Sequence, residues 1–204
     1  MALPFQDSFT DSPTTQLHTH NAVWVMYSSS AIQVGSTNKA EGLSGTSLGA
    51  TASCNTSPAL NANQYAQCHF VSAGGYPGLW VHFQVSTETG YLLIYNGDVY
   101  KVVNGVLGST IGNCGAFTSS DLAYIQAIES GSTVTLSFQK NGAAQGSPIV
   151  DSSSAILGGT SGIFFYAGTG GTIDDFETGN ATGAGGGSNW GALLSESFNR
   201  LIQG

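Results

Sequence analysis

The sequence predicts an all-β sandwich or barrel, followed by a flexible linker and a short amphipathic segment. Three observations carry this prediction: stretches in which apolar and polar residues alternate, Asn-Gly pairs between them, and a composition poor in helix-forming residues. Of the 204 residues, 29 are Gly and only 8% are charged, whereas an average domain is about 25% charged. A chain of this length can bury a core without disulfides.

The clearest predicted strand spans residues 132–138. Its apolar side chains Val134, Leu136 and Phe138 share one face, and the polar residues between them share the other. This alternation is typical of a strand with one face toward solvent. Weaker patterns of the same kind raise the prediction to about ten to twelve short strands, with the others at residues 5–9, 22–27, 65–71, 78–85, 91–95, 99–103, 122–129, 162–167 and 172–177.

Asn-Gly pairs separate several of these strands. They occur at residues 96–97, 104–105 and 141–142. Asn and Gly both tolerate positive φ, which the tight turns of β-hairpins require. The pairs therefore predict antiparallel hairpins at all three places.

The composition changes after Thr178, which divides the chain into a sandwich (1–178), a Gly-rich linker (179–188) and an amphipathic segment (189–204). The last segment predicts a short helix with one apolar stripe. Such a helix is marginal alone in water, so it needs a surface to pack on. It either folds back on the sandwich or docks on a partner or on sister copies, and the linker favours docking. The stripe consists of Trp190, Leu193, Leu194, Phe198, Leu201 and Ile202.

The charge balance excludes two classes of function. The chain has 4 Lys+Arg against 12 Asp+Glu, a formal net charge of −8. Four cationic side chains cannot build a nucleic-acid-binding patch or a basic membrane-surface helix. No apolar run reaches 18 residues, so we expect no membrane insertion. The N-terminal residues lack the pattern of an export signal, and we expect no signal peptide.

Three cysteines, Cys54, Cys68 and Cys114, are an odd number at scattered spacing. This is neither a disulfide framework nor a metal-binding Cys pattern. Three free thiols are the favoured interpretation, and a Cys54–Cys68 pair is the alternative.

Several of these segments resemble one known family. They are residues 5–9 with Trp24, the hairpin at 90–103, and the run from Ser130 to Glu177 that closes on Asp174-Asp175-Phe176. Together they are similar to concanavalin A-like lectin/glucanase (laminin-G-like) domains over residues 5–178. The resemblance implies an antiparallel jelly-roll β-sandwich. Domains of this family occur as sugar-binding modules, as glycoside hydrolases and as surface domains of bacteriophage virions, and the fold alone chooses none of these.

Candidate sugar-binding residues are Tyr76, Tyr91, Tyr95 and Asn96. Tyr76 lies at the crest of a Gly/Pro turn, where an aromatic ring is exposed. Tyr91 and Tyr95 share a strand face beside Asn96, so that rings and an amide would be available together. The alternative is that the tyrosines are ordinary half-buried residues of a sheet.

The carboxylates do not form a glycosidase pattern. The Glu-x-Asp-x-(x)-Glu motif of the family's glucanases is missing, and Asp174, Asp175 and Glu177 form the one acidic cluster. We therefore expect a protein that is not an enzyme. The resemblance implies that a structural calcium could join the first and last strands at Asp7 and Asp174, since hard oxygen ligands suit that ion. No other cofactor is expected.

The sequence-based hypothesis is a non-catalytic surface protein of a virus particle, such as a bacteriophage decoration, fibre or tail protein. Its expected partners are other virion proteins or sister copies, bound through residues 189–204 in a homo-oligomeric assembly, together with surface glycans. Its expected location is the virion surface. A free carbohydrate-binding module is the alternative, and a divergent glycoside hydrolase is a third.

Overall fold

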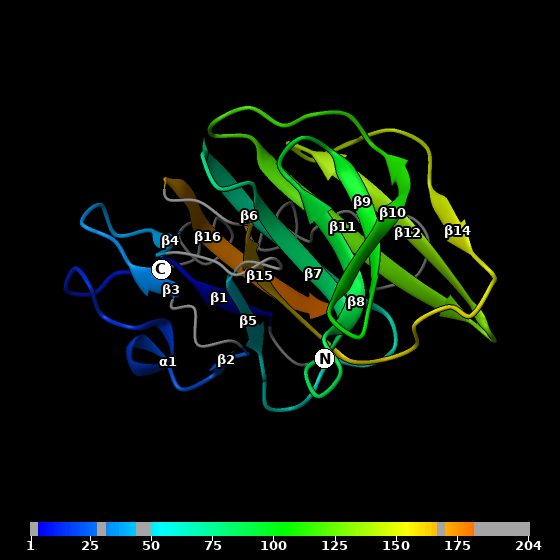
Figure 1. Ribbon diagram of the computed structural model, residues 1–204, viewed down its shortest axis with the longest axis horizontal. Coiled ribbons are helices and arrows are strands. Elements are labelled where there is room, and N and C mark those ends of the chain that lie inside the picture. Colours follow the sequence, from blue (N-terminus) through cyan, green and yellow to red (C-terminus); the bar gives the residue numbers. More distant parts are fainter. Residues whose placement is uncertain (1–3, 28–31, 44–49, 167–169, 182–204) are drawn as a thin grey trace, which may run out of the picture.

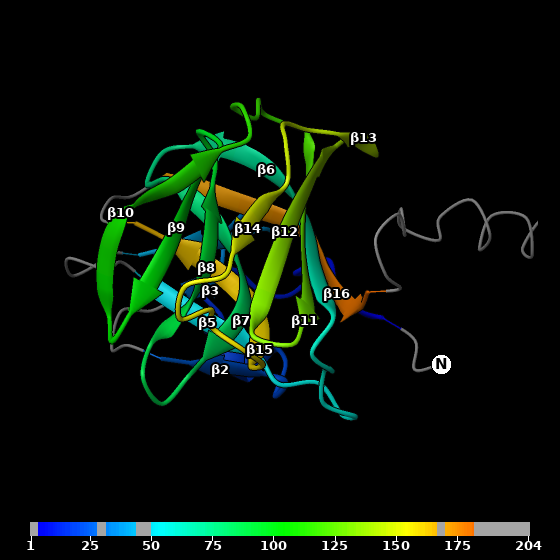
Figure 2. The same ribbon diagram turned by 90° about the vertical axis from the view of Figure 1, so that its right-hand side faces the viewer.

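Two antiparallel sheets lie face to face in the computed structural model (Figures 1 and 2), which describes residues 4–27, 32–43, 50–166 and 170–181. The one described helix, α1, has four residues, Leu17–His20. The chain is thus almost entirely β, as the alternation and the turn signals predict. In the described ranges no helix is long and apolar enough to cross a membrane.

The first sheet has nine strands in the order β13-β12-β11-β6-β16-β4-β3, with β1 paired to β16 and β14 paired to β12. Its central strands β6 and β16 are its longest, at ten residues each. The strands are β1 (Phe5–Asp7), β3 (Ile32–Val34), β4 (Ala40–Gly42), β6 (Gln64–Ala73), β11 (Leu122–Ser130), β12 (Thr133–Lys140), β13 (Ala143–Ala144), β14 (Ile149–Asp151) and β16 (Gly171–Asn180).

The second sheet has seven strands in the order β10-β9-β8-β7-β15-β5-β2. Consecutive hairpins join β7 to β10, and β15 then inserts between β7 and β5. The strands are β2 (Trp24–Met26), β5 (Ala50–Cys54), β7 (Pro77–Gln84), β8 (Thr89–Ile94), β9 (Asp98–Val103), β10 (Val106–Asn113) and β15 (Thr160–Phe165).

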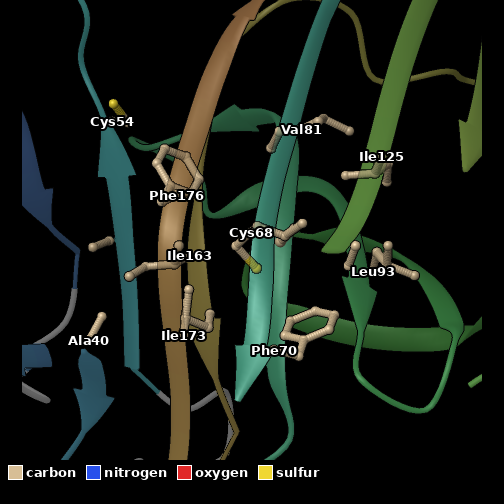
Figure 3. Packing of buried hydrophobic residues seen from close by; sticks show 14 of the residues in the cluster. Ala40, Cys54, Cys68, Phe70, Val81, Leu93, Ile125, Ile163, Ile173 and Phe176 are labelled. Atoms are coloured by element: carbon tan, nitrogen blue, oxygen red, sulfur yellow. The ribbon is translucent and has the colours of Figure 1, made fainter. Parts of the chain in front are cut away.

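The core fills the space between the sheets, where apolar side chains from both inner faces meet (Figure 3). From the nine-stranded sheet come residues such as Phe70, Ile125 and Phe176, and from the other sheet residues such as Leu93 and Ile163. All five are fully buried. Alternation along each strand therefore puts every second side chain into one shared core, as a sandwich requires.

A second apolar cluster covers the outer face of the seven-stranded sheet. On β8, Leu92 alternates with the core residues Tyr91 and Leu93, so it points to the opposite face. Outward-facing side chains of β7, β9 and β15 contact Leu92 on this outer face. The cluster consists of Trp80, Phe83, Leu92, Ile94, Val102 and Phe164. This sheet is therefore apolar on both faces, and its outer face forms the floor of the candidate site.

The three Asn-Gly pairs form the predicted hairpin turns. Asn104 and Gly105 lie between β9 and β10 with φ of 49° and 73°, and Asn141 and Gly142 lie between β12 and β13 with φ of 52° and 80°. Gly97, between β8 and β9, has φ of 84°, and a Cβ there would lie 2.4 Å from the carbonyl oxygen of Gly115. Only glycine fits this position without displacing the backbone.

The end of the sandwich lies further along the chain than the composition indicates. Gly179 and Asn180, expected to begin the linker, pair with Tyr65 and Gln64 as the last residues of β16. The Asn180 side chain also accepts a 2.8 Å hydrogen bond from the backbone N–H of Asn61. Residues 182–204, with the predicted amphipathic helix, lie outside the described residues.

All three cysteines are free and buried. Burial raises the pKa of each thiol, to about 11 for Cys114. The interpretation of free thiols is therefore confirmed.

Candidate functional site

A cavity of about 350 Å³ opens on the outer face of the seven-stranded sheet. This volume is at the lower end of the range for small-molecule sites, about 300–1,000 Å³. Its lining is mainly aromatic and aliphatic, with one amide, and consists of Tyr76, Leu92, Ile94, Asn96, Tyr100, Leu107, Phe164 and Tyr166. We call it the aromatic cavity.

Tyr76, Asn96 and Tyr166 lie close together because they flank the ends of three neighbouring strands, on the same side of the sheet. Tyr76 precedes β7, Asn96 follows β8, and Tyr166 follows β15. Strand β7 pairs with both β8 and β15. Residues far apart in the sequence are thereby brought to one place.

Two exposed tyrosine rings form one side of the aromatic cavity. Tyr76 is 51% exposed and Tyr166 is 37% exposed, and their ring centroids lie 6.3 Å apart with an interplanar angle of 71°. Tyr76 has φ of 43° directly after Gly75, also at positive φ. The turn therefore lifts the Tyr76 ring out of the core, as its place at a Gly/Pro turn predicts. Exposed rings of this kind supply apolar area and a polar hydroxyl together.

A polar network borders the aromatic cavity at the β8–β9 turn. The Asp98 carboxylate accepts hydrogen bonds from the side-chain amides of Asn96 at 2.7 Å and Asn113 at 2.6 Å. The Asn96 side-chain oxygen in turn accepts the Asp98 backbone N–H at 3.0 Å. Burial, together with the neighbouring Asp98 carboxylate, raises the pKa of Tyr100. Its phenol therefore stays protonated as a hydrogen-bond donor at neutral pH.

The structure separates the other two predicted tyrosines from the aromatic cavity. Tyr91 is fully buried in the core, where its hydroxyl donates to Asp151 at 2.7 Å and accepts from the backbone N–H of Ile156 at 2.9 Å. Its proposed contact with sugar is wrong, because β8 alternates and position 91 faces inward. Tyr95 is half-buried against the core, with its ring centroid 5.7 Å from that of Phe70.

Sequence reasoning missed three aromatic residues of the cavity, Tyr100, Phe164 and Tyr166. Tyr100 carries a usable signal, because it shares a face of β9 with Val102, two residues along, and lies opposite Val99, which faces the core. Phe164 and Tyr166 lie in an unbroken apolar run, Ile163 to Tyr166, in which alternation cannot assign a face.

The predicted calcium ligands are engaged separately by protein groups. The Asp7 carboxylate accepts hydrogen bonds from Trp24 Nε1 at 2.7 Å and from the backbone N–H of Phe9 at 2.8 Å, and it lies 2.8 Å from His20 Nε2. Asp174 instead forms an ion pair with Lys39. Within the described ranges, no group of three or more His, Cys, Asp or Glu side chains is arranged to hold a metal ion. These residues do not fit the implied calcium site.

The aromatic cavity has no Asp or Glu among its described lining residues. A retaining glycosidase needs two carboxyl groups about 5–5.5 Å apart across the bond that it cleaves. The lining side chains can stack on a ligand and form hydrogen bonds with it, which suits binding.

The fold is that of concanavalin A-like jelly rolls, which confirms the resemblance found in the sequence. The carbohydrate-binding module CBM66 from Bacillus subtilis matches with a TM-score of 0.58 and 11% identity, covering 78% of this chain and 96% of the module. The lectin UEA-II complexed with galactose matches with a TM-score of 0.50 and 12% identity, covering 88% of this chain and 99% of the lectin.

An enzyme also shares the architecture. Xylan beta-1,4-xylosidase from Bacillus halodurans C-125 matches with a TM-score of 0.51 and 12% identity, covering 88% of this chain but 40% of the enzyme. No family model matches the chain, and no curated protein matches its sequence. At these identities the likeness establishes the fold.

Proposed function

We propose that the protein is a non-catalytic carbohydrate-binding domain whose ligand occupies the aromatic cavity. The observation that carries this proposal is the joint lining of one cavity by the exposed rings of Tyr76 and Tyr166, the Tyr100 ring and the Asn96 amide. A sugar ring has apolar C–H faces and polar hydroxyl edges. Aromatic faces match the first, and the Asn96–Asp98 network matches the second.

Fold relatives support the same class of function. Their printed descriptions include a carbohydrate-binding module and a lectin in complex with galactose. A fold does not determine a function. The residues that line the cavity are therefore stronger support for the proposal than the similarity of fold.

The test begins with a glycan array probed with the full chain, followed by calorimetric titration of the strongest ligand. Replacing Tyr76 by Ala should weaken binding about tenfold, or about 1.4 kcal/mol, because the most exposed ring of the cavity is lost. The fold should persist, since this side chain is half exposed.

Tyr27→Ala is the matched control. Tyr27 is also an exposed tyrosine, at 36%, but it does not line the aromatic cavity. Equal affinity of the wild type and Tyr76→Ala would contradict the proposed site, and no binding to any array glycan would contradict the proposed function.

We further propose that the domain is displayed on the surface of a virus particle, as a bacteriophage decoration, fibre or tail protein. The support is in the sequence: a Gly-rich stretch before residue 189 and the apolar stripe that includes Trp190 and Phe198. A tethered stripe of this kind suits attachment to neighbouring subunits, with the two large aromatic residues as the main contacts.

A further inference from the structure

A second cavity, of about 340 Å³, lies on the outer face of the nine-stranded sheet, which is the opposite side of the sandwich from the aromatic cavity. We call it the polar cavity. Six side chains define its character: Gln6 and Asp7 from β1, Gln67 and His69 from β6, and Asp175 and Glu177 from β16. They meet here because β16 pairs with both β1 and β6.

Gln67 is a buried amide without a protein partner. It is only 2% exposed, lines the polar cavity, and makes no side-chain hydrogen bond within the described part of the chain. The buried side-chain polar atoms without a partner in the described residues are Thr51 Oγ1 and Trp80 Nε1, so the Gln67 amide atoms reach the solvent of the cavity. A ligand in the cavity would replace that solvent as the hydrogen-bond partner of the amide.

His69 also has one ring nitrogen engaged by the protein. Its Nδ1 lies 3.0 Å from the carbonyl oxygen of Ser120, which can only accept, so Nδ1 donates. The other nitrogen, Nε2, has no partner among the described residues. The ring is thus held in place by the protein while it lines the polar cavity.

Three carboxylates line the polar cavity, those of Asp7, Asp175 and Glu177, and give it a negative charge. Glu177 accepts hydrogen bonds from the Tyr65 hydroxyl at 2.5 Å and the Gln6 amide at 2.6 Å, which are neutral groups. Asp175 stands at φ of 50°, where the pairing of β16 with β6 shifts register.

No lysine neutralises this charge. The three lysines of the chain form ion pairs with other carboxylates, those of Asp174, Asp151 and Asp121. A cationic ligand therefore finds a complementary site in the polar cavity.

We propose that the polar cavity binds a small hydroxylated ligand that carries a protonated amine, namely a deacetylated amino sugar. Its ammonium group pairs with the Asp175 and Glu177 carboxylates. The Gln67 amide donates hydrogen bonds to its hydroxyls and accepts hydrogen bonds from them, and His69 Nε2 accepts one. This site is separate from the aromatic cavity and does not depend on the function proposed for it.

The test is a calorimetric titration of the full chain with glucosamine, beside glucose and N-acetylglucosamine. Glucosamine should bind, more weakly as salt is added, and the two uncharged sugars should bind at least about tenfold less tightly, since hydrogen bonds to charged groups are the stronger ones. The same titration of Tyr76→Ala should give the same glucosamine affinity, which separates this site from the aromatic cavity.

Two variants locate the site. Asp175→Asn keeps the shape and tolerates positive φ, and Gln67→Leu replaces an amide that has no protein partner; each should weaken glucosamine binding about tenfold or more. Asp174→Asn is the matched control. It removes the same charge one residue along the chain, but from a carboxylate that already forms an ion pair with Lys39. It should leave the affinity unchanged.

Three results would overturn the proposal: no glucosamine binding by the wild-type chain, equal affinity for glucose and glucosamine, or equal losses in Asp174→Asn and Asp175→Asn. If Gln67→Leu loses its β-sheet circular dichroism spectrum, Asp175→Asn alone decides the outcome.

Discussion

Asp121 joins the loop before β11 to the turn after β12. Its carboxylate accepts 2.7 Å hydrogen bonds from the backbone N–H and the hydroxyl of Thr118 and from the side-chain amide of Asn141, and it pairs with Lys140 at 3.1 Å. Burial alone would raise the pKa of Asp121, but these hydrogen bonds outweigh it and hold the pKa well below the usual 3.8. The ionised form is therefore favoured by folding.

This lowered pKa predicts an acid-sensitive contribution to stability. A carboxyl group whose pKa is lower in the folded state stabilises the fold at pH values above its unfolded pKa of 3.8. This contribution is lost progressively as the pH falls from 3.8 through the folded-state pKa. Asp121→Asn should lower the free energy of unfolding by about 1–3 kcal/mol at neutral pH. The difference from the wild type should shrink below pH 3.8 in urea unfolding. A difference that is constant with pH would contradict this assignment.

Single residues also show where sequence reasoning succeeds. Tyr76 could be placed on the surface because turn chemistry is local. Tyr91 could not, because its side depends on the register of β8 and on burial by the opposite sheet. The family resemblance implies a calcium role for Asp7, whereas its Trp24 and His20 partners arise from tertiary packing. Local chemistry was predictable, and partnerships over long sequence separations were not.

At the scale of elements, the Asn-Gly hairpins offer a matched pair of glycine substitutions. Gly97 and Gly142 have nearly equal φ, 84° and 80°, but a Cβ at Gly97 meets the Gly115 carbonyl oxygen at 2.4 Å, whereas a Cβ at Gly142 has nothing within 4 Å. Both Ala variants carry the cost of a left-handed residue, about 1–2 kcal/mol. Gly97→Ala should cost measurably more, because it also displaces the backbone of Gly115.

Chemical denaturation of the two variants measures the difference. Equal midpoints and slopes for Gly97→Ala and Gly142→Ala would show that the contact with Gly115 does not constrain the turn. A larger loss in Gly97→Ala, next to Asn96, would show that the border of the aromatic cavity is built on this turn.

Strands with clear alternation are predictable, and length alone does not decide the outcome: the eight-residue β10 is missing from the predicted strands, whereas the three-residue β1 and β2 lie within predicted ranges. β12 has clean alternation over eight residues, whereas β3 and β4 have three residues each and β5 reads Ala-Thr-Ala-Ser-Cys. Segments this short form strands because neighbours already in the sheet offer them hydrogen bonds. Composition predicts a linker at the last two residues of β16, because Gly and Asn are typical of turns.

For the whole molecule, the described sandwich ends at residue 181 and the apolar stripe lies beyond it. We predict that the full chain assembles in solution, and that a chain ending at Ala181 remains a folded monomer. The cut must follow residue 181 because Ala181 donates to the Asn63 carbonyl. Light scattering gives the mass of both, and circular dichroism checks the fold.

Two full-length variants control for the length of the chain. Trp190→Ala and Phe198→Ala should lower the assembled mass, since large aromatic residues dominate such contacts. Unfolding of the shortened chain would show instead that residues 182–204 complete the core, and equal masses would argue against assembly through this segment.

The central claim is that the aromatic cavity binds a saccharide, and mapping the ligand on the folded chain by NMR tests it most directly. The backbone amide shifts of the full chain are followed during titration with the strongest array glycan that carries no free amine, so that the polar cavity is not engaged. We predict that the largest changes cluster at Tyr76, Asn96–Tyr100 and Phe164–Tyr166, on one face of the seven-stranded sheet. Shifts centred on the nine-stranded sheet, or no saturable shifts, would contradict the account.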